Sequence, residues 1–317
     1  MYTLCSKIQI GSYSFTSVNE VLIVRSINAL CATAKIKVPV SAVLKQKDST
    51  NMAVETAKEI KINDEVEIQL GYNESYNVEF TGRVSKINYT TPLEIECEDA
   101  YFLAKSKMVN FCGKMSLKEC LQKCGLPIAH AIELNLRNFV VQNKPVSWVL
   151  NKLKKEYGIQ VFFDMDGKII AGRAFDVVSK KVKYELRKNV IRDDDLQFQQ
   201  ASDVKLKVKS ICIMKDGSRV EGEIGKEGGV EKTLYFYDVE SPGELKSLAE
   251  QELKKYSRDG YVGEIETFLF PYVEPCMVAE LVDPVYSQRD GCYYVEAVET
   301  TFGTSGARRK VNIGIAV

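Results

Sequence analysis

The stretch Leu93-Glu94-Ile95-Glu96-Cys97-Glu98 alternates apolar and acidic residues without interruption. Successive side chains of a β-strand point to opposite faces of a sheet. This period of two therefore predicts a strand with one face on a core and the other in water or on a partner. The same alternation recurs in Ala34–Val38, Glu65–Leu70 and Val204–Lys209. We expect a chain built mainly from antiparallel β-strands.

The middle of the chain has the pattern of helices instead. Ser116 and Glu119 are spaced as a capping box, and the apolar stripe that follows ends at Gly125, which predicts a helix over 116–124. A second helix is expected over 145–157, with a proline in its first turn and Gly158 at its end. Asp164–Gly167 then predicts the turn of a hairpin. Together these signals indicate a small α+β unit.

Two more segments have helical spacing. Apolar residues recur every three or four positions in 49–60, which predicts a short helix there. Residues 241–244 combine a capping box with a proline start, which predicts a helix over 241–258.

Segments near the two ends of the chain resemble each other. Residues 62–97 and 273–315 share the order of an alternating strand, a longer strand and a final alternating strand. Chance similarity between amphipathic strands is the alternative explanation. We predict a mainly β fold with an α+β insert, in which two similar antiparallel β-barrels flank a small α+β domain. The predicted domains are 1–105, 106–200 and 201–317, with the helix at 241–258 inserted in the last one and packing on the middle domain.

The composition excludes several kinds of chemistry. The 317 residues contain 43 Lys+Arg, 43 Asp+Glu and a single histidine, His130. A general nucleic-acid binder needs a surplus of basic residues, and a site with two or three histidine ligands needs more than one histidine. His130 follows an expected helix end, and we interpret it as a surface or structural residue. We therefore predict no catalytic residue, no metal site and no cofactor.

Three charged motifs have two interpretations each. Asp193–Asp195 is either a cation site or a solvated turn, and adjacent acids that point in different directions favour the turn. A row of acids on and after one strand is either solvated or faces a partner: Glu94, Glu96, Glu98 and Asp99. A row of lysines on one strand face is either solvated, which the spacing favours, or faces nucleic acid in a pore: Lys205, Lys207 and Lys209.

The nine cysteines indicate a reducing environment. Their number is odd, no C-x-x-C pair is present, and the first residues lack a basic segment followed by an apolar run. We expect free thiols in a protein made in a cytoplasm. No run of about eighteen apolar residues occurs, so no membrane insertion is expected.

Motifs in order along the chain resemble the late control D family, the tail hub proteins of contractile-tailed phages, which includes the Mu-type tail protein and the hub part of VgrG. The resemblance is carried by Phe80–Val84 before Leu93–Asp99, by Leu153–Ile159, by Leu245–Leu253 before Gly260–Gly263, and by Asp290–Gly303 before Gly306. The positions that match the family motifs are Phe80, Gly82, Val84, Cys97, Asp99, Tyr157, Gly158, Asp290, Gly291, Tyr293, Val295, Phe302 and Gly306.

The resemblance implies a structural baseplate or tail hub, without enzyme activity, in a phage tail or a related contractile injection system. Such a hub is a homotrimer that adapts a six-fold tail tube to a three-fold spike. The implied partners are the tube protein, a spike protein on a separate chain and a tape-measure protein, while DNA passes through the lumen without specific binding. The implied location is the tail tip or baseplate of a virion, after assembly in the cytoplasm of the host bacterium.

The alternative is a cell-wall-degrading or receptor-binding tail-tip protein. The absence of a catalytic motif in the sequence disfavours the enzyme, and the internal repeat favours the hub over a receptor-binding module.

Overall fold

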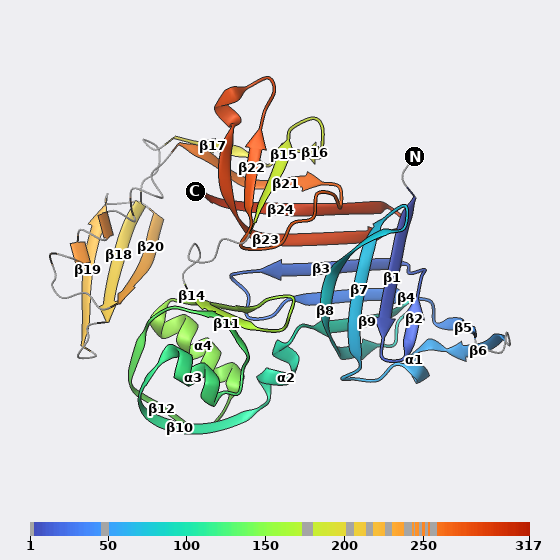
Figure 1. Cartoon of the computed structure of the whole chain (residues 1–317), viewed down its shortest axis with the longest axis horizontal. Helices are drawn as coiled ribbons and strands as arrows, with labels where there is room; N and C mark the ends of the chain where they lie inside the picture. Colours follow the sequence, from blue (N-terminus) through green and yellow to red (C-terminus); the bar gives the residue numbers. More distant parts are fainter. Residues whose placement is uncertain are drawn as a thin grey trace.

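The chain is mainly β-structure with a helical insert (Figure 1). The computed structural model describes residues 3–45, 51–172, 180–200, 206–213, 218–225, 230–237, 243, 245–246, 249–250, 253 and 259–317. In this part of the chain one 14-stranded sheet dominates, and four smaller sheets accompany it. The predicted mainly β class with an α+β insert is confirmed.

The N-lobe is the part of the large sheet formed by the first hundred residues, on the right in Figure 1. Its strands follow the order β3-β4-β9-β8-β7-β1-β2, and every neighbouring pair is antiparallel. The strands are β1 (Leu4–Ile10), β2 (Tyr13–Phe15), β3 (Glu20–Ser26), β4 (Thr33–Val38), β7 (Glu65–Tyr72), β8 (Ser75–Asn88) and β9 (Leu93–Glu98).

The C-lobe is the remaining part of the large sheet, at the top of Figure 1. Its strands are β15 (Lys181–Glu185), β16 (Val190–Arg192), β17 (Gln197–Gln199), β21 (Gly260–Thr267), β22 (Val278–Val282), β23 (Gly291–Gly303) and β24 (Gly306–Ala316), with the 3₁₀ helix η1 (Ser287–Arg289). We expected residues 181–199 in the middle domain, but β15 pairs with β22, and β16 and β17 pair with β21.

The two lobes share hydrogen bonds. Residues Ala297–Gly303 of β23 pair antiparallel with Ser26–Glu20 of β3, so the large sheet runs without a break from one lobe to the other. Each lobe nevertheless has its own hydrophobic core. Phe302 and Ala307 belong to C-lobe strands but pack in the N-lobe core. The expected pair of separate barrels is not confirmed, because a shared ladder joins what the sequence suggested as two units.

The internal repeat corresponds to two equivalent three-stranded meanders. Strands β7, β8 and β9 pair in chain order, and so do β22, β23 and β24. Before β7, Asn63 has a left-handed φ of 77° and donates its amide to the Val84 carbonyl, while Val84 donates to the Asp64 carbonyl. Before β22, Cys276 has a φ of 74° and donates to Val295, and Val295 donates to Met277. The same backbone pattern thus begins both meanders.

The middle domain is a compact α+β unit, residues 106–172, below the lobes in Figure 1. Its elements are β10 (Met108–Ser116), α3 (Leu117–Lys123), β11 (Ile128–Ala131), β12 (Asn135–Pro145), α4 (Val146–Tyr157), β13 (Gln160–Phe163) and β14 (Ile169–Gly172). The predicted capping box is confirmed, since the Ser116 side chain accepts from the Glu119 amide and the Glu119 side chain accepts from the Ser116 amide. The predicted second helix and the β13–β14 hairpin are also confirmed.

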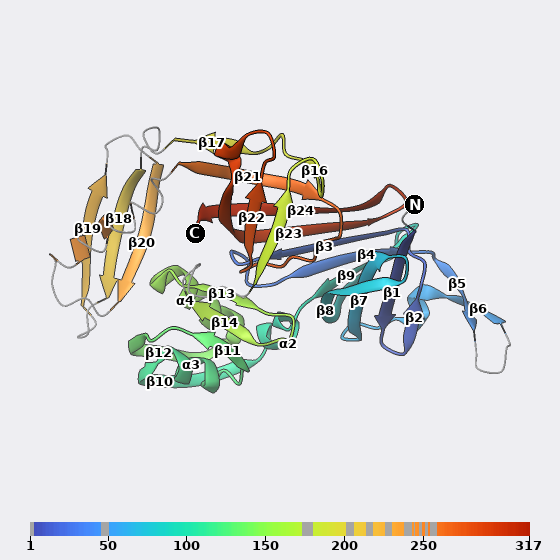
Figure 2. The same ribbon diagram turned by 45° about the horizontal axis from the view of Figure 1, so that its top comes forward.

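The helix predicted over 49–60 is wrong for its described part. Strand β6 (Asn51–Glu55) pairs with β5 (Ser41–Lys45), and only one turn, α1 (Thr56–Glu59), is helical. The Thr56 hydroxyl donates to the Pro39 carbonyl and its amide to the Val40 carbonyl, which ties this turn to the base of the hairpin. Figure 2 shows the hairpin projecting from the N-lobe. A second short helix, α2 (Tyr101–Lys105), leads into the middle domain.

A separate three-stranded sheet lies at the side of the molecule, on the left in Figures 1 and 2. It consists of β18 (Leu206–Ile213), β19 (Arg219–Gly225) and β20 (Val230–Tyr237). The described residues of the predicted helix 241–258 are helical, and the rest of it lies outside the described residues. Leu245 and Ala249 form a small core with Cys212 and Phe236, so the described part of this helix packs on the side sheet. We had expected it to pack on the middle domain.

Candidate functional site

The junction of the two lobes contains buried charges. Arg309 of β24 has no exposed surface, and its Nη2 atom bonds to Glu79 of β8, which is 3% exposed. Arg309 Nη1 also donates to the carbonyls of Leu269, at 2.7 Å, and Pro271, at 3.0 Å. Its guanidinium lies 5.4 Å from the centre of the Tyr272 ring. One side chain therefore joins both lobes to the loop of residues 268–277.

Two effects act on the Glu79 carboxyl in opposite directions. Burial raises its pKa, because a charged group loses hydration, while Arg309 lowers it through charge and hydrogen bonding. The balance is a raised pKa. Such a pair is tolerated in a protein interior only while both partners are present. Glu79 and Arg309 therefore fix how β8 and β24 face each other.

A second ion pair lies beside the first. Arg25 of β3 donates from Nη2 to Glu274, at 3.1 Å, and from Nη1 to the Tyr272 hydroxyl, at 3.3 Å. The Arg25 side chain is 11% exposed. Both pairs hold the same loop, so the junction is a connected set of two arginines, two glutamates and a tyrosine.

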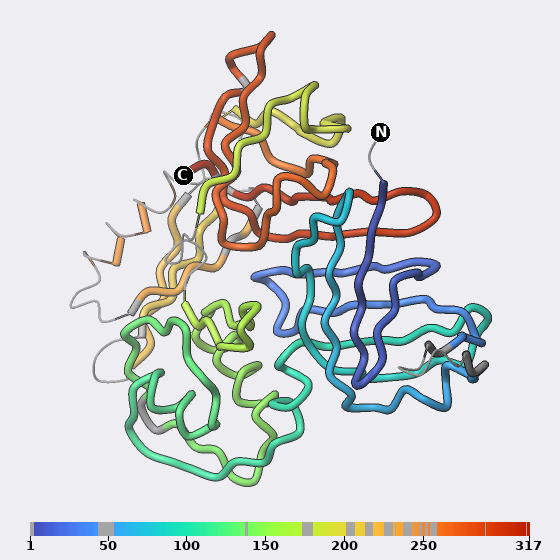
Figure 3. Tube along the Cα trace, turned by 45° about the vertical axis from the view of Figure 1, so that its right-hand side comes forward, coloured from blue at the N-terminus to red at the C-terminus, as the bar shows by residue number. Residues whose placement is uncertain are grey.

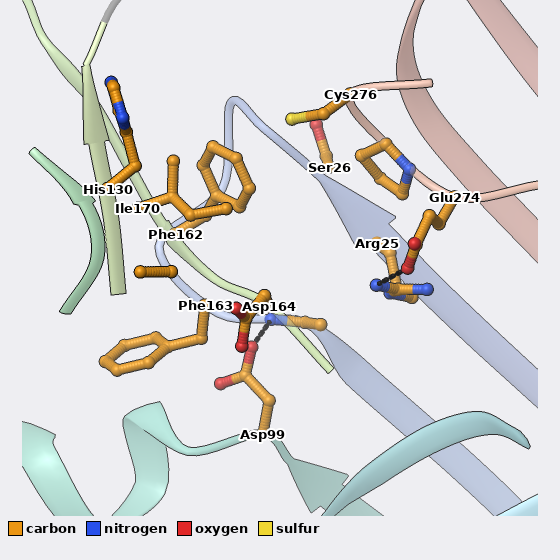
Figure 4. A pocket seen from close by; sticks show the side chains of 13 residues that line it. Arg25, Ser26, Asp99, His130, Phe162, Phe163, Asp164, Ile170, Glu274 and Cys276 are labelled. Carbon is orange, nitrogen blue, oxygen red and sulfur yellow. Dashed lines mark hydrogen bonds and ion pairs between the residues drawn. The ribbon is translucent and has the colours of Figure 1, made fainter. Parts of the chain in front are cut away.

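A cavity of about 290 Å³ separates this junction from the middle domain. Figure 4 shows the Arg25–Glu274 pair on one side of the cavity and Phe162, Phe163 and His130 on the other. The His130 ring is half-buried, and its Nε2 atom has no hydrogen-bond partner. The cavity is thus lined by β3, by the middle domain and by the loop 268–277.

Asp99 also lines this cavity and corrects an expectation. We expected it in an outward row of acids, but it is 6% exposed. Its Oδ2 accepts from the Ala32 amide at 2.7 Å and its Oδ1 from the Tyr101 amide at 2.9 Å. Burial raises the pKa of Asp99 to about 6, although these amides oppose the shift. Both carboxylate oxygens thus accept hydrogen bonds from backbone amides, which is a structural role.

The rest of that row is paired within the chain. Half-buried Glu94, Glu96 and Glu98 lie next to Lys35, Lys86 and Lys105, with nitrogen–oxygen distances of 3.2, 3.9 and 2.6 Å. The lysine row has intrachain partners too. Lys207 pairs with Glu223 and Glu231, and Lys209 pairs with Glu221, while Lys205 lies outside the described residues. The interpretation of a lysine row facing nucleic acid is not supported by these pairs.

The acidic turn predicted at 193–195 lies at the surface of the C-lobe. Asp194 and Asp195 are exposed, and Asp194 pairs with Arg192 at 3.4 Å. Among the described residues no group of three or more histidine, cysteine or acidic side chains is arranged to hold a metal ion.

The motif positions of the N-lobe lie mostly in its core. Phe80, Val84 and Cys97 are buried there. A Cβ atom on Gly82 would lie 2.2 Å from the Glu98 carbonyl oxygen, so only glycine lets β8 approach β9 this closely. Because these side chains face the core, their role is to pack against other core residues.

In the middle domain, the motif pair Tyr157-Gly158 ends α4. Tyr157 is buried in the domain core. Gly158 has a left-handed φ of 61°, and a Cβ there would lie 1.8 Å from the Tyr235 ring of the side sheet. The Tyr235 hydroxyl donates to the Lys155 carbonyl at 3.2 Å. This motif therefore joins the middle domain to the side sheet.

The C-lobe motif positions have similar structural places. Asp290 Oδ1 accepts from the Asp283 amide at 2.7 Å, and the Tyr293 hydroxyl accepts from the Tyr261 amide at 3.2 Å. A Cβ on Gly291 would lie 2.8 Å from the Tyr293 ring, and Gly306 turns β23 into β24 with a φ of 108°. Val295 packs in the C-lobe core, whereas Phe302 packs in the N-lobe core.

Of the thirteen motif positions, only Asp99 lines the junction cavity. Sequence reasoning missed Glu79 and Arg309, because neither departs visibly from its surroundings. Val78 and Glu79 alternate on β8 with the valine 38% exposed and the glutamate buried, the reverse of the usual polarity. Arg309 is the middle residue of the basic run 308–310. No local signal in the sequence identifies this pair.

Two general properties were also expected from the sequence. None of the nine cysteines, all of which lie in the described part of the chain, forms a disulfide bond. Within the described residues, the helices are too short or too polar to cross a membrane.

The fold is that of the tail proteins of phages and of related secretion devices. The chain is similar to the 43 kDa tail protein of prophage MuSo2 from Shewanella oneidensis. The match covers 98% of each chain, with 14% sequence identity and a TM-score of 0.62. A tail protein from Neisseria meningitidis MC58 gives the same TM-score at 10% identity, over 98% of this chain and 96% of that one.

A third similar structure is an Escherichia coli component of the type VI secretion system, described as structurally similar to bacteriophage T4 tail proteins. Its TM-score is 0.58 at 8% identity, over 96% of this chain and 76% of that one. No family model and no curated protein matches the sequence. The tail-hub resemblance expected from the sequence motifs is confirmed as a shared fold.

Proposed function

We propose that this protein is a structural hub of a phage tail or a related contractile injection system. Three copies would form a ring between a six-fold tail tube and a three-fold spike, at the tail tip or baseplate, after assembly in the bacterial cytoplasm. The tube protein, a spike protein and a tape-measure protein are the proposed partners, and DNA would cross the lumen without specific binding. The proposal includes no catalysis and no cofactor.

The duplicated meander is the observation that carries this proposal. Strands β7–β9 and β22–β24 begin with the same backbone hydrogen bonds and lie in two lobes with separate cores. Three chains with two similar barrel-like lobes each would present six nearly equivalent lobes to a six-fold tube, and three-fold symmetry to a spike. Similarity to tail proteins over nearly the whole chain supports the same assignment.

The motif positions and domain division fit this proposal. We propose three units, an N-lobe ending near residue 105, the middle domain up to residue 172 and the remaining chain. The thirteen motif positions would maintain the shape of these units, since most of them pack in cores or close turns.

The assembly state tests the proposal. The protein should be purified alone and after co-expression with the tube and spike proteins of the same tail, and its mass measured by light scattering. We expect three chains per particle and an averaged electron-microscopy image with six similar densities around a central hole. A particle that stays monomeric with both partners present contradicts the hub.

Activity separates the hub from the alternative of a wall-degrading tail-tip protein. We expect no soluble fragments above the buffer control when the purified protein is incubated with peptidoglycan. Release of fragments that stops after a single carboxylate is changed to its amide would favour the hydrolase instead.

A further inference from the structure

The equivalence of the two meanders extends to the strands beyond them. Strand β4 pairs antiparallel with β9, the last strand of the first meander, and β21 pairs antiparallel with β24, the last strand of the second. Beyond β4 lies β3, and beyond β21 lie β16 and β17, and these pairs are antiparallel as well. Strand β3 of the N-lobe therefore has its counterpart in β16 and β17 of the C-lobe.

Residue counterparts in the two meanders follow from the ladders. Val84 of β8 and Val295 of β23 both exchange backbone hydrogen bonds with the residues that precede their meander. Both also stand directly before a register shift in the pairing with the next strand. The two residues therefore correspond, and Lys86–Asn88 correspond to Ala297–Glu299.

The same ladders connect each meander to its far strand. Starting from Val84 and from Val295, the paired residues can be followed strand by strand to β3 and to β17. The matched positions on these paths, N-lobe first, are Cys97 and Ile313, Ala34 and Gly263, Thr33 and Val262, and Val24 and Gln197. Strand β17, Gln197–Gln199, thus corresponds to Val24–Ser26 of β3.

The edge of β3 has a partner, and the corresponding edge of β17 is open. Inside the chain, β3 pairs through its second edge with Ala297–Gly303 of β23. Its counterpart β17 pairs only with β21 among the described strands, and all three of its residues are exposed. The counterpart of the β23 segment is the end of β8, where pairing with β7 stops at Arg83 and no described strand lies on that side of Lys86–Asn88. Each lobe therefore has one open edge.

The backbone of β17 is directed toward its open edge. Phe198 lies opposite Tyr261 of β21, but the Tyr261 amide donates to the Tyr293 hydroxyl, at 3.2 Å, and not to β17. In an antiparallel ladder, a residue that does not bond to one neighbouring strand directs its N–H and C=O groups to the other side. The Phe198 amide and carbonyl are therefore directed to the open edge, where another strand can pair with them.

Exposed apolar side chains border both open edges. Phe198 is 44% exposed, and Tyr89, directly after β8, is 81% exposed. The counterpart of Tyr89 is Thr300, which lies beside β3 at the junction inside the chain and is only 2% exposed. A strand added beside the end of β8 would cover Tyr89 in the same way.

Phe198 takes the place of Arg25. At the junction inside the chain, Arg25 bonds to Glu274 in the segment just before β22. In the corresponding segment just before β7, Ile62 is 59% exposed. An exposed phenyl ring on one edge thus matches an exposed apolar side chain beside the other.

The two open edges cannot meet within one chain. Strands β24, β23, β3, β4 and β9 separate β21 from β8 in the large sheet. In Figures 1 and 2, β17 lies at the outer end of the C-lobe and β8 lies in the N-lobe, and the trace in Figure 3 shows the same separation of the lobes. A second copy of this chain offers each edge its counterpart.

We propose that β17 of one copy pairs antiparallel with the end of β8 of the next copy, with Gln199 opposite Lys86 and Phe198 opposite Ile87. This ladder repeats between chains the β3–β23 ladder inside each chain, and it rests on the proposed hub. Backbone hydrogen bonds give such strand addition its affinity, and side chains fix its register. Contacts between unlike edges of identical chains close into a ring when the rotation per copy allows it, which leaves neither edge open.

A disulfide between copies tests this register. Inside the chain, the Ile27 amide donates to the Glu296 carbonyl, so the next pair, Ser26 and Ala297, is a non-hydrogen-bonded pair with Cα atoms about 4.5 Å apart. Its counterpart between copies is Gln199 opposite Lys86, which is close enough for a disulfide.

The variant Lys86→Cys/Gln199→Cys should therefore give covalent assemblies of up to three chains after mild oxidation. It is made in a Cys112→Ser background, which removes an exposed native thiol. The control Lys86→Cys/Gln197→Cys places the thiols on a diagonal of about 7–8 Å and should cross-link far less. Ser26→Cys/Ala297→Cys should close a disulfide inside one chain and keep the mass of one chain. Non-reducing gel electrophoresis compares them, alone and with the tube and spike proteins.

A proline at position 198 tests the backbone contact. Because the Phe198 amide faces the open edge, Phe198→Pro removes no bond to β21 but blocks pairing with another strand. We expect the dissociation constant of the assembly to rise by about tenfold or more, as measured by sedimentation. Phe198→Tyr keeps the amide and the ring and should associate like the wild type. Circular dichroism identifies any variant that fails to fold.

The outcomes separate this ladder from the proposed function. A trimer that forms without a disulfide between positions 86 and 199, although the pair at 26 and 297 closes, overturns the ladder and leaves the hub proposal standing. Cross-linked assemblies that grow beyond three chains support the ladder and contradict the three-fold hub. A protein that stays monomeric with tube and spike proteins overturns both.

Discussion

At the scale of single residues, the Glu79–Arg309 pair is the feature whose loss should cost most. Changing Glu79→Gln leaves the buried Arg309 charge without a neutralising carboxylate, and we expect the free energy of unfolding to fall by about 3–5 kcal/mol. The control is Asp194→Asn, whose pair with Arg192 is 64% exposed on both sides and should contribute less than about 1 kcal/mol. Denaturant unfolding measures both.

The double variant Glu79→Leu/Arg309→Met keeps this test informative when the single variant folds poorly. It removes both buried charges, so it should be more stable than Glu79→Gln. Equal losses in Glu79→Gln and in the surface control would show that the pair does not hold the lobes together.

Asp99 should make stability depend on pH in an unusual direction. Its pKa is about 6 in the folded protein, and about 3.9 is normal for an unfolded chain. Between these values the folded state holds a proton that the unfolded state has lost. The contribution of Asp99 to the free energy of unfolding is therefore largest below about pH 4. It declines as pH rises to about 6, by up to about 3 kcal/mol.

The variant Asp99→Asn lacks this titration. The difference in unfolding free energy between wild type and Asp99→Asn should shrink as pH rises from about 4 to about 7. Urea unfolding at intervals across this range measures it, and a difference that stays constant would contradict the raised pKa.

At the scale of elements, the end of α4 joins the middle domain to the side sheet. The change Gly158→Ala adds a Cβ at a left-handed φ, which costs about 1 kcal/mol, and also meets the Tyr235 ring. The control Gly125→Ala has a similar φ of 68°, but its Cβ would meet only the flexible Lys107 ammonium. We expect the larger loss of thermal stability at residue 158.

Removing the ring separates the two causes of that loss. In a Tyr235→Ala background, Gly158→Ala should cost about as much as Gly125→Ala, because only the backbone penalty remains. The comparison uses melting temperatures of all four variants. An unchanged cost in that background would mean that the ring is not the obstacle.

At the scale of the whole molecule, the ladder between β3 and β23 should couple the lobes. Ile265→Ala removes fully buried side-chain volume from the C-lobe core, and Leu150→Ala does the same in the middle domain. Because the lobes share a sheet, Ile265→Ala should accelerate hydrogen exchange in β3 and β4 as well as in β21–β24. The effect of Leu150→Ala should stay largely within the middle domain.

Exchange followed by mass spectrometry distinguishes these patterns, with the wild-type protein as reference. Acceleration confined to the C-lobe in Ile265→Ala would mean that the lobes open independently despite their common ladder.

The sequence by itself determined the features that depend on neighbouring residues. Alternation in 93–98 predicted β9, and Ser116 and Glu119 predicted the start of α3. The repeat of 62–97 in 273–315 indicated the same order of strands near both ends of the chain, which the structure contains as β7–β9 and β22–β24. These patterns are visible locally because a strand has a period of two and a helix cap involves residues three apart.

Only the tertiary structure decided the features that depend on distant partners. Pairing with β5 made 51–55 a strand despite its helical spacing, and the β3–β23 ladder merged two expected barrels into one sheet. Burial of Glu79 depends on Arg309, which lies 230 residues away along the chain. Periodicity shows which face of an element is apolar, but it does not show which other element covers that face. That partner, like the charge that neutralises a buried carboxylate, is a residue or an element far away in the chain.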